Sequence, residues 1–379
     1  MIYLDSAATT LQKPRRVSKA VKKAVNTLAS PGRGGHRHSM KAAETAFECR
    51  TLAAALFGMA DPSNVVFTSN ATHGLNIAIK ALAKPGSRAL VSGYEHNSVM
   101  RPLRASGAEI IIARSELFEP EMAVFEFERW LETERISLVV LNHMSNVFGY
   151  ILPAERIAEQ CKKYGVPFIL DASQSAGCVD IDFDSLGAAF VAMPGHKGLY
   201  GPQGTGLLLC APYIDVAASG LMQGGSGGNS VSDTMPKFLP DGLEAGTHNM
   251  PGIAGLFTGL EYVSRRKPKI ILEHAQRLMT LAARELAVLP GVRVFTGGHG
   301  DCHGGVLSFQ VESVDCESAA EQLSELGFAV RAGLHCAPEA HRTVGTATRG
   351  TVRVSVSRFN TEREIRLLAE AVAVVAKRC

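Results

Sequence analysis

The sequence predicts an α/β protein built on a mainly parallel sheet, with a second, smaller α+β domain. Through about the first 250 residues, short apolar runs alternate with segments of helical periodicity. These runs are apolar at nearly every position, which is typical of parallel strands covered by helices on both faces. After Pro251 the pattern changes to long helical segments and separate strands, which favours the smaller domain.

The expected elements follow from these patterns along the chain. Residues 217–250 are rich in Gly, Ser and Asn with little periodicity, so we expect a long functional loop. Beyond this loop we expect one long helix over about 252–289 and a C-terminal helix from Thr361. Strands are expected at 64–68, 88–92, 138–142, 167–171, 188–192, 207–209, 304–310 and 351–356, with helices at 72–83 and 154–164.

Length, charge and cysteine content narrow the class of protein. A chain of 379 residues favours two domains, a large one over 15–255 and a small one formed by 1–14 and 256–379. A net charge of +3, with both signs interspersed, argues against a nucleic-acid or anionic-membrane partner. No apolar run reaches transmembrane length, and the first residues lack a signal-peptide pattern. The eight cysteines are scattered singly, which favours a reducing cytoplasm.

The most informative segment is 193–206, where Lys197 lies in a glycine-rich turn after the apolar run 188–192. A lysine at the end of a buried strand is partly desolvated, which lowers its pKa and favours the nucleophilic free amine. Lysines that form Schiff bases are built in this way, and pyridoxal phosphate (PLP) is their commonest partner. A solvated loop lysine is the alternative for this segment alone.

Other polar residues also follow predicted strands. Ligands of open α/β sheets gather beyond the carboxyl ends of the strands, so these residues should lie near Lys197. Thr72 lies where a helix is predicted to begin and could bind a phosphate, a role compatible with ordinary helix capping. Asp171 could pair with the pyridinium nitrogen of PLP, and Gln174 could bond its phenolic oxygen. A helix-capping aspartate is the alternative for Asp171.

Four further residues are candidates for the same site. The ring of His96 could stack on the cofactor, and Asn146 is a similar strand-end amide. Cys336 follows Arg331 in a turn-rich, cationic segment that favours the thiolate, although a buried structural thiol is the alternative. Arg353 interrupts an apolar strand and could bind a substrate carboxylate or form a structural ion pair. A zinc site around Cys336 would lack a second nearby cysteine, so we expect no metal.

Taken together, these segments resemble the class V aminotransferase-fold enzymes, and more narrowly the cysteine desulfurases. The resemblance runs nearly end to end and implies the PLP-dependent transferase fold type I, with PLP in the large domain. It also implies a homodimer with active sites at the subunit interface. The short loop 331–336 is similar to the Suf-type (group II) branch. The segments that carry the resemblance, in the family's order, are 3–10, 95–96, 171–174, 195–197, 244–249 and 331–336.

The resemblance assigns roles to residues of this chain. Lys197, Cys336 and His96 would be catalytic, and Lys197 would bind PLP covalently. The implied cofactor-binding residues are Ala71, Thr72, His96, Asn146, Asp171, Gln174, His196, Lys197 and, reaching across the dimer, Thr247. The implied substrate-binding residues are His36, Asn146, Arg331 and Arg353.

The implied activity converts L-cysteine to L-alanine, with Lys197 as general base. A persulfide would form on Cys336, and its sulfur would pass to an acceptor, which could be a protein. The alternatives are a selenocysteine lyase, or another PLP-dependent β-lyase or aminotransferase on this fold. A scaffold that retains PLP without turnover is a non-enzymatic alternative. Pro194 replaces a usual phosphate-binding serine, Gly198 is an apparent insertion, and His73 replaces a usual acidic residue, which together indicate a divergent subfamily.

Overall fold

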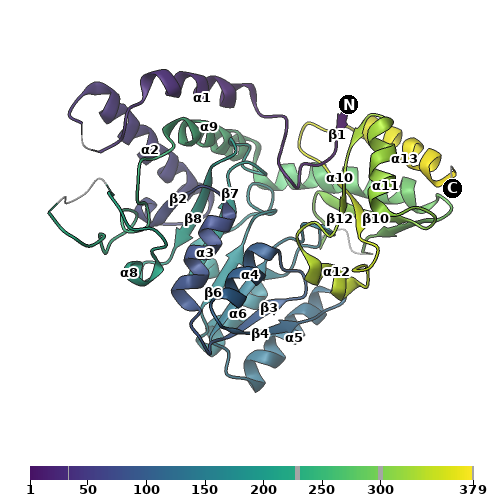
Figure 1. Ribbon diagram of the computed structural model, residues 1–379, viewed down its shortest axis with the longest axis horizontal. Helices are drawn as coiled ribbons and strands as arrows, with labels where there is room; N and C mark the ends of the chain where they lie inside the picture. Colours follow the sequence, from purple (N-terminus) through teal and green to yellow (C-terminus); the bar gives the residue numbers. More distant parts are fainter. Residues whose placement is uncertain (33, 227–230, 298–301, 378–379) are drawn as a thin grey trace.

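A seven-stranded sheet lies at the centre of the larger part of the protein in the computed structural model (Figure 1), which describes all residues except 33, 227–230, 298–301 and 378–379. The strands are β2 (Val65–Thr68), β3 (Arg88–Ser92), β4 (Glu109–Ala113), β5 (Leu138–Asn142), β6 (Phe168–Asp171), β7 (Phe190–Pro194) and β8 (Gly206–Cys210). Their order is β2-β8-β7-β6-β5-β3-β4, and β8 alone among them runs antiparallel to the rest. The predicted mainly parallel α/β sheet is confirmed.

Both faces of this sheet are buried under helices. Successive side chains of a strand point to opposite faces, so Leu138 and Val140 of β5 join one core and Val139 and Leu141 join the other. Helices α3, α4 and α8 cover the first face, and α2, α5, α6 and α9 cover the second. The helices of this part are α1 (Arg15–Thr27), α2 (Arg37–Leu56), η1 (Pro62–Asn64), α3 (Ala71–Leu82), α4 (Asn97–Ala105), α5 (Pro120–Thr133), α6 (Ala154–Tyr164), α7 (Phe183–Leu186), α8 (Val216–Ser219) and α9 (Met250–Arg266).

Side-chain caps determine where two of these helices begin. Asn70 Oδ1 accepts a hydrogen bond of 2.9 Å from the His73 N–H at the start of α3. His96 Nδ1 accepts a bond of 3.0 Å from the Ser98 N–H at the start of α4. Because α3 follows β2 and α4 follows β3, both helices begin at the carboxyl edge of the sheet.

The second part of the chain has its own core around an antiparallel sheet of order β12-β13-β10-β9. The N-terminus joins this part, because β1 (Ile2–Tyr3) pairs in parallel with β11 (Phe328–Ala329) and Leu4 is buried in the same core. Figure 1 shows both chain ends here. The remaining elements are α10 (Pro268–Ala287), β9 (Val292–Phe295), β10 (Val306–Val311), α11 (Cys316–Glu325), β12 (Arg331–Gly333), α12 (Pro338–Val344), β13 (Thr351–Ser355) and α13 (Glu362–Lys377).

The single helix predicted over about 252–289 is wrong, because the chain forms α9 and α10 with a break at Lys267. Lys267 has a φ of 65°, and Pro268 both lacks an N–H and disfavours helical geometry in the residue before it. The predicted domain boundary after residue 255 falls inside α9, which packs against α1 and α2. The domain limits stay a prediction. Among the described residues, no helix is both long and apolar enough to span a bilayer.

A buried ion pair joins α2 to the segment that follows α8. Arg50 NH2 lies 2.5 Å from Glu244 Oε2, and the two side chains are 10% and 5% exposed. Glu244 also accepts hydrogen bonds from the Phe67 N–H and from His248. Burial alone would raise the pKa of Glu244, but Arg50 and His248 hold this pKa below its ordinary value.

Replacing Arg50 with methionine should lower the free energy of unfolding by about 3–5 kcal/mol, because Glu244 would remain buried without its main counter-charge. Urea unfolding followed by circular dichroism measures the change. Arg156→Met is the matched control, since Arg156 forms an exposed pair with Glu121 and should cost less than about 1 kcal/mol. Similar losses in the two variants would contradict the prediction.

Candidate active site

Lys197 lies just beyond the carboxyl end of β7, in a pocket that contains most of the predicted cofactor-binding residues. The pocket brings together eight of them, namely Ala71, Thr72, His96, Asn146, Asp171, Gln174, His196 and Lys197. The expectation that strand-end residues converge on Lys197 therefore agrees with the structure. Its lining also includes residues that the sequence analysis did not single out, namely Asn70, Ser98, Asn142 and Ser173.

The amine of Lys197 and the carboxylate of Asp171 are electrostatically coupled in this pocket. Burial lowers the pKa of Lys197 to about 8, and the charge of Asp171 opposes part of that shift. Asp171 is 2% exposed, and its Oδ1 accepts bonds from the Ser173 N–H at 2.9 Å and from the Ser173 hydroxyl. Burial raises the pKa of Asp171, whereas Ser173 and Lys197 lower it. The pocket thus favours a nucleophilic amine beside a buried carboxyl group.

A chain of short contacts connects His96 to Thr72 through Ser98. Ser98 Oγ lies 2.9 Å from His96 Nδ1 and 2.8 Å from Thr72 Oγ1. Burial, together with the positive charges of Lys197 and Arg353, lowers the pKa of His96 to about 4, so its ring is neutral near pH 7. Sequence reasoning missed Ser98 because a serine in the first turn of a helix is usual there.

The N-terminal segment holds His196 in place. The carbonyl oxygen of His196 accepts bonds from the Thr10 N–H at 3.2 Å and from Lys13 Nζ at 2.8 Å. The His196 ring contacts Thr9 Oγ1 through Nδ1 at 3.0 Å. Burial, with smaller contributions from Lys197 and Lys13, lowers the pKa of His196 to about 4. Residues far apart in the sequence therefore position the backbone next to Lys197.

Arg353 lies in β13 and is 2% exposed. It donates a hydrogen bond of 2.7 Å to Asp5 Oδ1 and one of 2.9 Å to the Asn146 carbonyl. The structural ion pair considered from the sequence is therefore present. Arg353 Nε is nevertheless buried without a partner among the described residues, and so is Asn146 Oδ1. Both atoms are free to contact a polar ligand.

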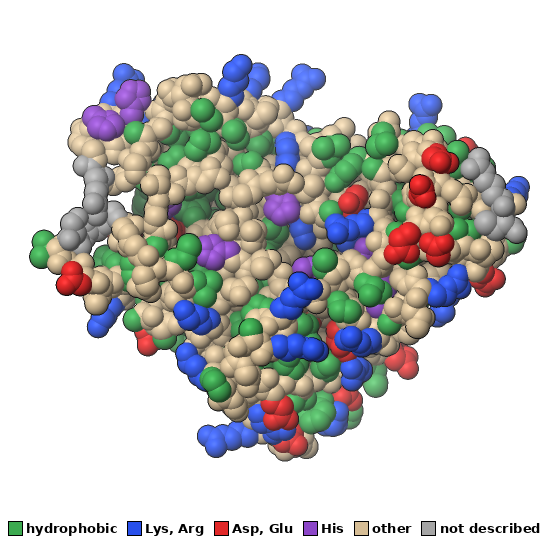
Figure 2. All heavy atoms as spheres, in the orientation of Figure 1, with side chains coloured by type: hydrophobic (Ala, Val, Ile, Leu, Met, Phe, Trp, Pro, Cys, Tyr) green, Lys and Arg blue, Asp and Glu red, His purple; other side chains and the backbone are tan. Residues whose placement is uncertain are grey.

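Cys336 is exposed in the loop between β12 and α12, and two hydrogen bonds attach this loop to the pocket. Its carbonyl accepts a bond of 2.8 Å from the Asn97 N–H, and the His335 carbonyl accepts one of 2.8 Å from Asn146 Nδ2. His335 and Cys336 have φ values of 49° and 57°, which are uncommon for residues other than glycine. On the face in Figure 2, basic side chains gather over α4 and α12, which flank the loop. Arg331 is exposed on β12, opposite Arg353 in β13.

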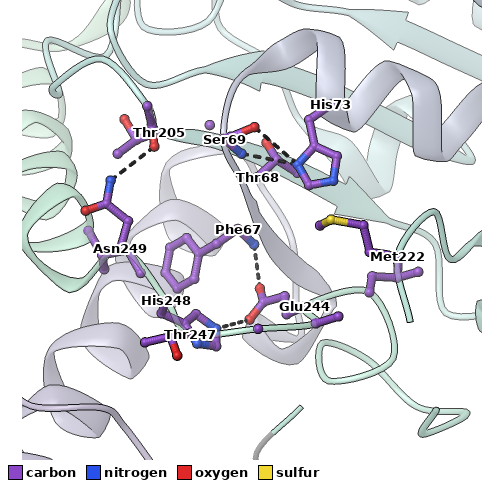
Figure 3. Close-up of a pocket in the computed structure, with 16 residues that line it drawn as sticks. Phe67, Thr68, Ser69, His73, Thr205, Met222, Glu244, Thr247, His248 and Asn249 are labelled. Carbon is purple, nitrogen blue, oxygen red and sulfur yellow. Dashed lines mark hydrogen bonds and ion pairs between the residues drawn. The ribbon is translucent and has the colours of Figure 1, made fainter. Parts of the chain in front are cut away.

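Five predicted site residues do not line the Lys197 pocket of the single chain: Arg331, Cys336 and Arg353, described above, and also His36 and Thr247. His36 is exposed at the start of α2, where its ring accepts a bond of 3.4 Å from the Ser39 N–H. Thr247 lies in a second cavity of about 220 Å³, shown in Figure 3 with Glu244 bonded to His248. His73, one of the departures from the family pattern, also lies in this second cavity.

The rate at which the Lys197 amine reacts should depend on pH as its lowered pKa predicts. In ligand-free protein, reductive methylation of Lys197 should reach half its maximal rate near pH 8, because the free amine forms above that pH. Residue-resolved mass spectrometry measures the rate, with the exposed Lys163 as the control. Asp171→Asn should shift the midpoint to lower pH, because it removes a negative charge. A midpoint near pH 10 would contradict the desolvation argument.

Comparison with known proteins identifies the family of this chain. The family Aminotransferase class-V matches residues 2–368. A probable cysteine desulfurase of Methanothermobacter thermautotrophicus is 31% identical, with 99% of this chain and 94% of the relative covered. A probable cysteine desulfurase of Xylella fastidiosa is also 31% identical, over 100% of this chain and 91% of the relative. This chain spans 56% of a longer relative of the same description from Mycolicibacterium paratuberculosis.

Solved structures of cysteine desulfurases are also similar to this protein. The apo cysteine desulfurase of Thermococcus onnurineus NA1 superposes with a TM-score of 0.91 at 28% identity, covering 100% of this chain and 95% of that one. The cysteine desulfurase CsdA of Escherichia coli, in an S-sulfonic acid form, has a TM-score of 0.87 at 28% identity, covering 99% and 94%. The predicted fold type I is confirmed. The chain thus belongs to the aminotransferase class-V family of PLP-dependent enzymes, and its relatives there are cysteine desulfurases.

Proposed function

We propose that this protein is a cysteine desulfurase that uses PLP, converts L-cysteine to L-alanine and transfers the sulfur through Cys336. One observation carries the proposal. A half-buried lysine of lowered pKa, a buried aspartate and an exposed cysteine loop bonded to the pocket meet at one edge of the sheet. The relatives described as cysteine desulfurases support the same activity.

The pocket residues fit PLP group by group. Lys197 would bind its aldehyde, and Asp171 would face its ring nitrogen and keep that nitrogen protonated. The Ala71 and Thr72 N–H groups at the start of α3 have no hydrogen-bond partner among the described residues, and helix N-termini bind phosphate. The buried Asn146 Oδ1 lacks a partner, which is costly unless a polar ligand supplies one. His196 and Gln174 complete the lining that we assign to PLP.

The residues of this chain would then carry out the reaction in sequence. PLP, when bound, supplies an electron sink for the carbanion formed on the amino acid. Arg353 and Arg331 would bind the substrate carboxylate. The free amine of Lys197 would take the proton from the substrate Cα and hold it on Nζ. The Cys336 thiolate would attack the substrate sulfur, so that an S–S bond forms on Cys336 as the Cβ–S bond breaks. The electron pair of the broken bond would stay with the amino-acid fragment, which would take up a proton at Cβ to become alanine.

The proposal includes a homodimer. Thr247 lies in a cavity separate from that of Lys197, which suits a residue that serves the second active site of a dimer. His36 is exposed on α2 and could also act across the interface. Met40 and Phe47 on the same helix are 63% and 65% exposed, and a second copy of the chain would cover such apolar area. We place the reaction in the cytoplasm, because the described cysteines form no disulfide.

Lys197→Ala should abolish the visible absorbance of bound PLP and the formation of alanine from cysteine, because the covalent attachment and the base are both lost. Absorbance spectroscopy of the purified protein and an alanine assay measure the two effects. Lys163→Ala, which changes an exposed lysine, controls for the loss of a positive charge. An unchanged spectrum in Lys197→Ala would remove the central claim.

Cys336→Ala should retain the visible spectrum but lower alanine formation from cysteine by about 100-fold or more, because the sulfur acceptor is lost. Cys178→Ala is the matched control, since Cys178 lines a neighbouring cavity that Lys197 also borders. Turnover of selenocysteine in the same variants distinguishes a selenocysteine lyase, which would depend less on Cys336. Full cysteine turnover in Cys336→Ala would contradict its role as nucleophile.

A further inference from the structure

We propose that Ser98 is a further phosphate-binding residue, acting with Thr72 as a pair of hydroxyl groups. The inference rests on the proposed function, because the phosphate is that of PLP. Ser98 lies in the first turn of α4, and Thr72 lies in the first turn of α3. Both side chains line the Lys197 pocket, and their oxygen atoms are 2.8 Å apart.

The hydrogen bonds around Ser98 leave one hydroxyl proton of the pair available to an anion. His96 Nδ1 accepts from the Ser98 N–H at 3.0 Å, so this nitrogen carries no proton of its own to give. The Ser98 and Thr72 hydroxyls hold two protons, and one of these lies between the two oxygens. The second proton can point to His96 Nδ1, which lies 2.9 Å from Ser98 Oγ. Because the Ser98 N–H already engages the lone pair of that nitrogen, this proton can turn to a phosphate oxygen instead. A hydroxyl that also accepts a hydrogen bond is polarised and becomes a stronger donor.

The rest of the pocket explains why a second hydroxyl is needed there. Pro194 forms part of the wall and has neither an N–H nor a polar side chain to offer. Lys13 does not line this pocket, and its ammonium group donates to the His196 carbonyl and to Thr10. A phosphate dianion binds best to several charge-assisted hydrogen bonds. Ser98 adds a hydroxyl donor to the N–H groups at the start of α3.

The Ser98 hydroxyl can serve the phosphate without being needed to hold His96 in place. Ser98 Oγ lies 2.9 Å from His96 Nδ1 and 2.8 Å from Thr72 Oγ1. The serine therefore contacts both the threonine assigned to the phosphate and the ring assigned to the cofactor face. The backbone cap from the Ser98 N–H to His96 does not need the hydroxyl. Removing the hydroxyl alone should therefore leave α4 intact and change the phosphate site.

The test compares PLP with pyridoxal, which lacks the phosphate. Apoprotein is titrated with each compound, and the dissociation constants are obtained from the visible absorbance. Ser98→Ala should weaken PLP binding by about tenfold, the loss expected for one hydrogen bond to a charged group, and leave pyridoxal binding within about twofold. Ser98→Thr keeps the hydroxyl and should bind PLP nearly as tightly as the unchanged protein does.

Ser173→Ala is the matched control, because Ser173 lies in the same pocket but bonds to Asp171 at the other end of the cofactor site. It should affect PLP and pyridoxal to the same extent. Equal effects on the two compounds in Ser98→Ala, or no effect on either, would overturn the role of Ser98. If the unchanged protein binds neither compound, the proposed function itself fails, so the two failures are distinguishable.

Discussion

The burial of the Lys197 amine beside the Asp171 carboxylate is the constraint on which the rest of the site depends. Two ionisable groups are expensive to remove from water, and each offsets part of the cost of the other. The parallel sheet makes this arrangement possible. Asn142 at the end of β5 is in register with Asp171 at the end of β6, and Asp171 is in register with Ala192 of β7. Lys197 follows β7 at the same edge.

A second buried carboxyl group, that of Glu95, connects strand ends at the same edge of the sheet. Glu95 is fully buried, and its Oε1 accepts hydrogen bonds from the Ser92 hydroxyl and from the Asn142 N–H at 2.6 Å and 2.9 Å. Glu95 thus joins the ends of β3 and β5. Burial raises its pKa to about 8, and the negative charge of Asp171 adds to this effect. A neutral Glu95 at pH 7 places no second negative charge beside Asp171.

The site also needs parts of the chain that lie outside the large sheet. Arg353 comes from the antiparallel sheet of the second part and is held by Asp5 of the N-terminal segment. Asn146 connects Arg353 to the Cys336 loop, because its carbonyl accepts from the arginine and its amide donates to the His335 carbonyl. The buried arginine and the cysteine loop are therefore connected through one residue, by its backbone carbonyl and its side-chain amide.

The sequence by itself determined the features that depend on local patterns. Apolar runs and strand-end polar residues predicted six strands of the large sheet and the convergence of residues such as Asp171 on Lys197, because parallel strands end at one edge. Strands β1, β11 and β12 were missed because they span only two or three residues. Strands β4 and β9 were also missed although both contain apolar residues, and the break at Lys267 was hidden by continuous periodicity. Only the tertiary structure decided which distant groups meet. Ser98 and Thr72 are 26 positions apart in the sequence, and Arg353 and Asp5 are 348 positions apart. A pattern within a short segment cannot predict contacts between residues so far apart.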